Sequence, residues 1–148
     1  MGLEALDAVL ESNKGGVWFL PGAEPRAVQA AAKKAGFAYF HLDGKNITRK
    51  EQLMNAVATA LRLPKDFGHN WDALEESLVD LDMEADGFVI FYDHIDGLLT
   101  AHPDQFETLV ELLRDAVASW KEDGTPMAVL LSGAKAPKGV GRLRETAE

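Results

Sequence analysis

Short apolar runs alternate with helical stretches along most of this 148-residue chain. The runs contain many β-branched and aromatic residues, which is typical of buried strands, and the first two end at the turn signals Pro21-Gly22 and Asp43-Gly44. Between the runs, apolar residues recur at three- and four-residue spacing, which predicts amphipathic helices. Strands are therefore expected at residues 17–20, 37–42, 88–92 and 127–131.

Five helices are predicted between and before these strands. Because strands separated by helices form layered structures with parallel sheets, the pattern predicts an α/β fold. We expect a single domain with a mainly parallel sheet of about four strands flanked by helices. The helices are expected from Leu3 to Leu10, from Pro25 to Gly36, from the capping-box pair Thr48 and Glu51 to Pro64, from Asn70 onward, and from Pro103 onward.

Negative charge is concentrated in one part of the chain. There are 24 acids and 15 bases, which gives a net charge of −9, and no Lys or Arg occurs between Lys65 and Arg114. Such acidity argues against nucleic acid as a direct partner, because phosphates would be repelled. It favours a basic protein as the partner.

Several protein classes are excluded or disfavoured. The absence of cysteine excludes a disulfide framework, thiolate zinc sites and a cysteine nucleophile. No apolar run approaches the roughly 18 residues of a membrane span, and no leader pattern is seen at the N-terminus, so a soluble cytoplasmic protein is expected. Nucleophile elbows, P-loops and dinucleotide-binding motifs are absent, and no cofactor is predicted.

Two enzymatic interpretations remain open. Asp93, His94, Asp96 and His102 follow a predicted strand, and ligands bind at the carboxyl ends of parallel strands, so they could serve a metal-assisted enzyme. The alternative is a simple polar turn, since no spaced ligand set accompanies these residues. A second possibility is an acid–base pair of carboxylates one turn apart in the helix after Asn70, although the surrounding charge indicates exposure rather than burial.

The helix that follows Asn70 carries the most distinctive pattern. Apolar residues recur along one side and are expected to face the core, whereas acids recur along another side. No base on this helix offsets the repulsion between these acids, so the pattern is best explained if a cationic partner supplies the missing charge. The apolar stripe contains Trp71, Leu74, Leu78 and Leu81, and the acidic stripe contains Asp72, Glu76 and Asp80.

The segment from His41 to Asp82 resembles the barstar family of intracellular ribonuclease inhibitors, and a looser resemblance continues through the last predicted strand. It implies a barstar-like core at residues 37–132, with residues 1–36 as an added helix-strand-helix unit packed on that core. Residues 133–148 are expected to form a flexible tail. The shared marks are a strand ending in Asp43-Gly44, then Ile47, Leu63-Pro64, Phe67-Gly68, and Asn70-Trp71-Asp72-Ala73-Leu74 followed by Glu76.

The resemblance implies an inhibitor or immunity protein, monomeric when free, that blocks a basic ribonuclease. In the family, helix acids take the place of substrate phosphate; Asp72 matches one key acid, and Glu76 replaces an Asp. Asp66 and Glu75 stand where barstar has aromatic residues, which leaves open a regulator of another basic protein. The residues expected to bind the partner are Asp66, Gly68, Asn70, Trp71, Asp72, Ala73, Glu75, Glu76, Val79 and Asp80.

The acids beyond this helix, from Asp82 to Glu111, are expected to act at longer range. Opposite potentials accelerate association without direct contact, so these acids should steer a cationic partner toward the helix. Asp93 and Asp104 are expected to belong to this steering group.

Overall fold

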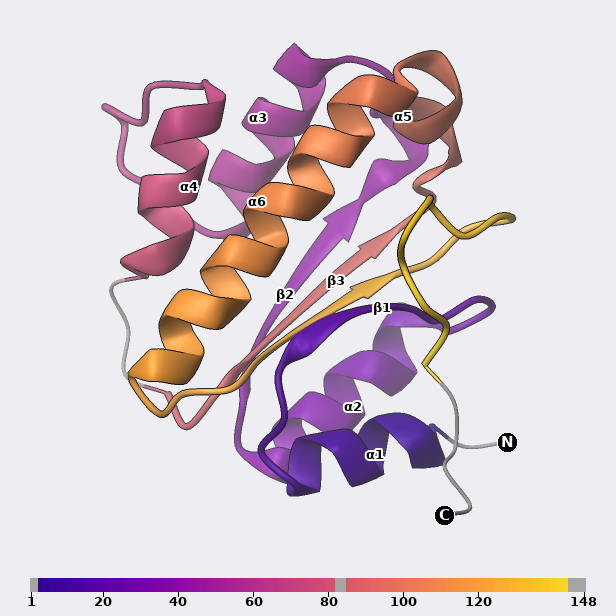
Figure 1. Cartoon of the computed structure of the whole chain (residues 1–148), viewed down its shortest axis with the longest axis vertical. Coiled ribbons are helices and arrows are strands. Elements are labelled where there is room, and N and C mark those ends of the chain that lie inside the picture. Colours follow the sequence, from indigo (N-terminus) through magenta and orange to yellow (C-terminus); the bar gives the residue numbers. More distant parts are fainter. Residues whose placement is uncertain (1–2, 82–84, 144–148) are drawn as a thin grey trace.

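Four parallel strands form one sheet in the order β1-β4-β3-β2 (Figure 1). The computed structural model describes residues 3–81 and 85–143. All four predicted strands are present within a residue of their expected bounds, so the predicted α/β fold with a parallel sheet is confirmed. The strands are β1 (Gly16–Phe19), β2 (Ala38–Asp43), β3 (Phe88–Asp93) and β4 (Met127–Leu131).

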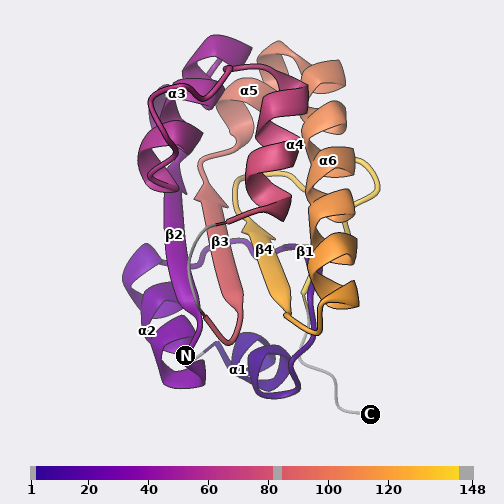
Figure 2. The same ribbon diagram turned by 90° about the vertical axis from the view of Figure 1, so that its left-hand side faces the viewer.

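Helices cover both faces of the sheet (Figures 1 and 2). Strand β2 follows β1 in the sequence but lies at the opposite edge of the sheet. Strands β3 and β4 then occupy the positions between them, in order from β2 back toward β1. Because parallel crossovers are right-handed, this reversal places the connecting helices on opposite faces. One face carries α1 (Glu4–Glu11) and α2 (Pro25–Ala35), and the other carries α3 (Lys50–Ala60), α4 (Trp71–Val79) and α6 (Pro103–Glu122).

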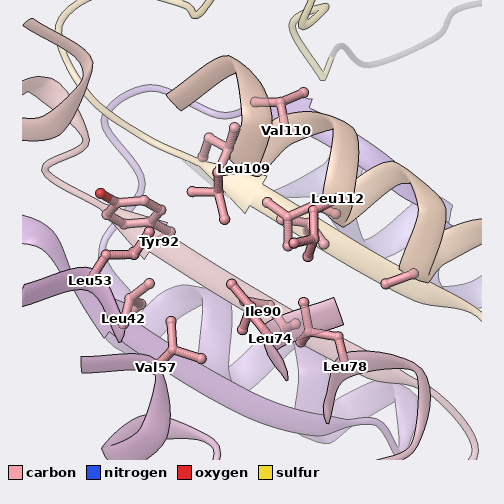
Figure 3. Close-up of a cluster of buried hydrophobic side chains, with 14 of the residues drawn as sticks. Leu42, Leu53, Val57, Leu74, Leu78, Ile90, Tyr92, Leu109, Val110 and Leu112 are labelled. Carbon is pink, nitrogen blue, oxygen red and sulfur yellow. The ribbon is translucent and has the colours of Figure 1, made fainter. Parts of the chain in front are cut away.

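The larger part of the core lies between the sheet and the second group of helices. Figure 3 shows side chains from β2, β3, α3, α4 and α6 meeting in this layer. Strand β3 is buried along its whole length, as expected for a strand covered on both faces. Its alternate residues divide between the layers: Ile90 and Tyr92 face α4 and α6, and Val89 and Phe91 face α1 and α2.

The N-terminal unit contributes the edge strand β1 and the helices α1 and α2, which cover one face of the sheet. Strand β1 pairs with β4, and Leu6 and Leu10 of α1 are almost fully buried. The segment after β4 also packs on this unit. The Phe19 N–H donates to the Gly141 carbonyl, and the Leu143 N–H donates to the Phe19 carbonyl. Within the tail that was expected to be flexible, residues 141–143 therefore lie along the outer edge of β1.

Two local features differ from the sequence prediction. A 3₁₀ turn, η1 (Gly44–Asn46), and a short helix, α5 (Asp96–Ala101), occupy the carboxyl ends of β2 and β3, where only polar turns were expected. At the start of α3, the side chain that accepts the capping hydrogen bonds is that of Gln52, whereas Glu51 was predicted. The Gln52 Oε1 atom accepts hydrogen bonds from the N–H groups of Thr48 and Arg49. No helix among the described residues is both long and apolar enough to cross a membrane.

Candidate functional site

Helix α4 is held firmly on its inner side. Leu74 and Leu78 are buried against the sheet and α6 (Figure 3). The indole N–H of Trp120, on α6, donates a 2.7 Å hydrogen bond to the Leu78 carbonyl. This bond satisfies one of the carbonyls that the C-terminal turn of a helix leaves unpaired. The outer side of α4 is thus presented to solvent by a helix that is anchored from within.

The start of α4 is capped by its preceding residue. The Asn70 side-chain oxygen accepts a 2.7 Å hydrogen bond from the Ala73 N–H, which is the N-cap arrangement that the sequence predicts. The same side chain donates to the Gly68 carbonyl. A Cβ at Gly68 would lie 3.2 Å from the Ala73 Cβ, so the absence of a side chain at Gly68 lets the loop pack tightly on the helix.

The loop before α4 also has internal support. Phe67 is buried, and its N–H donates to the Pro64 carbonyl at 3.0 Å. The His69 Nδ1 atom lies 2.8 Å from the Phe67 carbonyl oxygen, and the two rings are 4.8 Å apart between centroids. Loop and helix therefore present a preformed surface.

Asp72 and Glu76 are exposed on the outer side of α4. Asp72 lies in the first helical turn, where the helix dipole favours a negative charge. Asp80 is exposed as well, but it is the C-cap residue and has left the helical conformation. The predicted three-acid stripe is therefore two acids on the helix and a third beyond its end. Among the described residues, none of the three pairs with a Lys or Arg.

A groove between α4 and the segment after α3 extends this acidic surface. Asp66, Glu76 and Asp80 line it, and among the described residues Arg62 is the one base in its lining. Leu63 and Leu81 contribute an apolar part. Sequence reasoning found the three acids but not the groove, because its other wall comes from a different segment of the chain. Carboxylates around a partly apolar groove are suited to a long cationic side chain.

The ten predicted binding residues divide into two groups. The half-buried members support the helix as well as bordering its surface. The Lys50 ammonium, for example, lies 5.4 Å from the centre of the Trp71 ring, a distance suited to a cation–π contact. The exposed members are Asp66, Gly68, Asn70, Asp72, Glu76 and Asp80, and the half-buried members are Trp71, Ala73, Glu75 and Val79.

The residues considered for a metal-assisted enzyme do not form one site. Asp96 accepts a hydrogen bond from the Ala134 N–H, and His102 precedes α6. Asp93 and His94 do lie together, and Asp43 of β2 joins them. Asp93 is buried, and its predicted part in steering a cationic partner stays a prediction. The sequence pattern missed Asp43 in this group because β2 and β3 are distant in the chain.

Charge and burial shift the pKa values of one carboxyl group and two tyrosines on β2 and β3. The hydrogen bond from the Lys45 N–H lowers the pKa of Asp43. Burial, with a smaller contribution from the nearby Asp93, raises the pKa of Tyr39 to about 12 and that of Tyr92 further still. Both tyrosines are therefore neutral near pH 7 and can only donate or accept hydrogen bonds there.

Comparison with solved structures identifies relatives of the fold. The ORC2 protein of Aeropyrum pernix, in ADPNP-ADP complexes, is 19% identical with a TM-score of 0.60, over 86% of this chain and 38% of that one. The Drosophila ORC bound to DNA is 15% identical with a TM-score of 0.52, over 93% and 38%. The chain thus spans well under half the length of these proteins, and at such identities the likeness concerns the fold alone.

Family comparison is more specific. A search of curated proteins finds no match. The family model for barstar, described as the barnase inhibitor, matches residues 37–132. The matched region begins just before β2, ends just after β4, and contains the whole of α4 and its loop. Because it covers well over half of the sequence, this chain belongs to the barstar (barnase inhibitor) family.

Proposed function

We propose that this protein inhibits a basic ribonuclease by placing the outer side of α4 and the preceding loop over the phosphate-binding residues of the enzyme. The observation that carries the proposal is the pair Asp72 and Glu76, exposed on a firmly anchored helix within the region matched by the inhibitor family. In this proposal, the protein binds the ribonuclease and does not itself catalyse a reaction.

The physical basis is the replacement of phosphate by carboxylate. A ribonuclease must hold a negatively charged backbone, so its active site concentrates Arg, Lys or His side chains. Two carboxylates one helical turn apart present negative charge to such a site. Because α4 and its loop are already ordered, little conformational freedom is lost on binding.

The groove beside α4 extends the contact beyond these two acids. Asp66 and Asp80 would receive a cationic side chain from the rim of the enzyme, while Glu76 faces both the groove and the helix surface. Since Asp66 and Glu75 replace aromatic residues of barstar, we infer a target whose rim offers additional bases rather than aromatic pockets.

The decisive experiment is inhibition of purified basic ribonucleases by wild type and by the double variant Asp72→Ala/Glu76→Ala. We expect the double variant to weaken inhibition by about 100-fold or more, because each lost acid leaves a cation of the enzyme desolvated and unpaired. The matched control is Asp115→Ala/Glu122→Ala, which removes two exposed acids from α6 that lie outside the group expected to steer the partner. Equal inhibition by both double variants would refute the proposed surface.

A regulator of another basic protein is the second candidate. It is favoured by the two positions at which acids replace aromatic residues. Capture of partners from the native cell, with wild type beside the Asp72→Ala/Glu76→Ala variant, distinguishes the two functions. A dominant partner without ribonuclease activity, lost in the variant, would retain the surface and change the target.

A further inference from the structure

A second cluster of ionisable side chains lies at the carboxyl ends of β2 and β3. Figure 1 shows these strand ends close to α5. Asp43 and Asp93 are register partners at the last position of each strand, and His94 follows directly. The His94 Nδ1 atom is 3.3 Å from Asp43 Oδ1 and 3.4 Å from Asp93 Oδ1. One ligand atom from each of the three residues lies within 4.8 Å of the other two.

The buried member of this cluster lacks a hydrogen-bond partner. The Asp93 side chain is 9% exposed, and its Oδ1 atom has no hydrogen bond to any described residue. The His41 Nε2 atom lies 3.2 Å away, at ion-pair distance if that imidazole is protonated, but it forms no hydrogen bond with Asp93 or with any other described residue. Burying a carboxylate without a partner is costly, so a cation at this point would stabilise the folded chain.

Two of the three separations suit a tetrahedral metal ion, because His94 Nδ1 lies 3.3 Å from Asp43 Oδ1 and 3.4 Å from Asp93 Oδ1. Zinc binds nitrogen and oxygen ligands at about 2.0–2.1 Å, and tetrahedral geometry then separates neighbouring ligand atoms by about 3.3 Å. Two carboxylates and one imidazole also suit zinc or a similar transition metal better than calcium or magnesium, which require more oxygen ligands. Asp43 and His94 are 51% and 54% exposed, so an ion has access and a water molecule can complete its coordination.

Surrounding groups hold the cluster in place. The Lys45 N–H donates to Asp43 Oδ1 at 3.0 Å, which leaves a second lone pair on that oxygen. A Cβ at Gly44 would lie 2.5 Å from the His94 carbonyl oxygen, so the glycine lets the two strand ends approach closely. Such supporting contacts are the kind that orient metal ligands in proteins.

We propose that Asp43, Asp93 and His94 bind a divalent transition metal ion of the zinc type, with His41 as a positioning residue beside Asp93. The site shares no residue with the acidic surface of α4, so it stands independently of the proposed inhibition. It also differs from the metal-assisted enzyme considered from the sequence, because Asp43 replaces Asp96 and His102 as a ligand.

The test is calorimetric titration of Zn²⁺ into the full-length, metal-free protein in a weakly coordinating buffer. We expect one ion per chain, with affinity reduced at least about tenfold in Asp43→Asn and in His94→Asn. Asn is chosen at position 94 because the backbone there has a φ of 53°, which Asn tolerates better than most residues. The matched control, His102→Asn, removes a histidine outside the cluster and should bind Zn²⁺ as wild type does.

Two further measurements make the test decisive. Zn²⁺ should raise the melting temperature of wild type but not of His94→Asn, since an ion that binds only the folded state stabilises it. Co²⁺ in place of Zn²⁺ should give the intense visible absorption of four-coordinate cobalt, lost in the same variant. The proposal is overturned if wild type binds no Zn²⁺, or if His94→Asn and His102→Asn bind it equally. Ribonuclease inhibition by His94→Asn should be unchanged, which separates this outcome from that of the proposed function.

Discussion

Two sets of acidic residues in this protein present their carboxylates in different arrangements. Asp72 and Glu76 project from consecutive turns of α4 toward solvent, with no Lys or Arg paired to them among the described residues. Asp43 and Asp93 come from two strands and converge on one imidazole, that of His94. Acids that are spread over a helix suit a large cationic surface, whereas acids that converge suit a single ion.

The largest expected effect tests whether the helix acids depend on the core beneath them. Leu74→Ala should lower the free energy of unfolding by about 2–5 kcal/mol, because Leu74 is almost fully buried under α4. Asp72→Ala removes an exposed side chain from the outer side of α4 and should change the free energy of unfolding by no more than about 0.5 kcal/mol. Urea denaturation measures both. Similar losses from the two variants would mean that the outer face is structural rather than free for a partner.

The next effect concerns the anchoring of α4 at its C-terminal end. Trp120→Phe removes the indole donor to the Leu78 carbonyl and should destabilise the protein by about 1–3 kcal/mol. The matched control is Trp18→Phe on β1, a half-buried tryptophan that packs on the opposite face of the sheet. Thermal unfolding of both variants checks the prediction. No measurable loss from Trp120→Phe would show that the hydrogen bond to Leu78 contributes little.

A smaller effect is expected at the start of α4. Asn70→Ala removes the N-cap acceptor for the Ala73 N–H and should cost about 1 kcal/mol. Asn70→Asp keeps the acceptor but loses the donor to the Gly68 carbonyl, so it should cost less than Asn70→Ala. In titrations, Zn²⁺ affinity should be the same for both variants, because the strand-end cluster contains no residue of α4. A loss of Zn²⁺ binding in Asn70→Ala would show that the two groups of acids are coupled.

The smallest expected effect separates exposed from buried charge. Asp104→Asn should slow association with a cationic ribonuclease by less than about twofold, and more at low salt than at high salt, because Asp104 is exposed. Asp93→Asn should leave the association rate unchanged, since that carboxylate is buried. Stopped-flow measurement of both variants decides the matter. A greater slowing by Asp93→Asn would place its charge at the surface that the partner meets.

Much of the acidic surface of α4 could be predicted from the sequence because it is local. The N-cap, the apolar residues Leu74 and Leu78, and the acids at four-residue spacing all lie within one helix. The departure at Asp80 is also local: the helix ends at Val79, before the positions of Asp80 and Leu81 that the predicted stripes assign to it. The groove was not predictable in this way, since Arg62 and Leu63 reach it from another segment.

The tail after β4 shows that amino-acid composition alone does not predict where a segment packs. Its Gly, Lys and Arg content predicts fraying, yet the Leu143 N–H donates to Phe19, and Leu143 is buried against the N-terminal unit. A strand edge exposes unpaired backbone groups, and any segment that can reach the edge can satisfy them. Composition does not reveal which segment that is.

By itself, the sequence determined the alternation of strands with the main helices and the acid-bearing helix, because these depend on residue spacing within short segments. The parallel sheet followed from that alternation, and the family from the resemblance of the loop and helix around Trp71. Only the tertiary structure decided that Asp43 meets Asp93 and His94, that Asp93 is withdrawn from solvent, and that a groove extends the acids of α4. These features depend on which strand lies beside which and on what covers them. Such relations come from packing among distant segments, which no local pattern encodes.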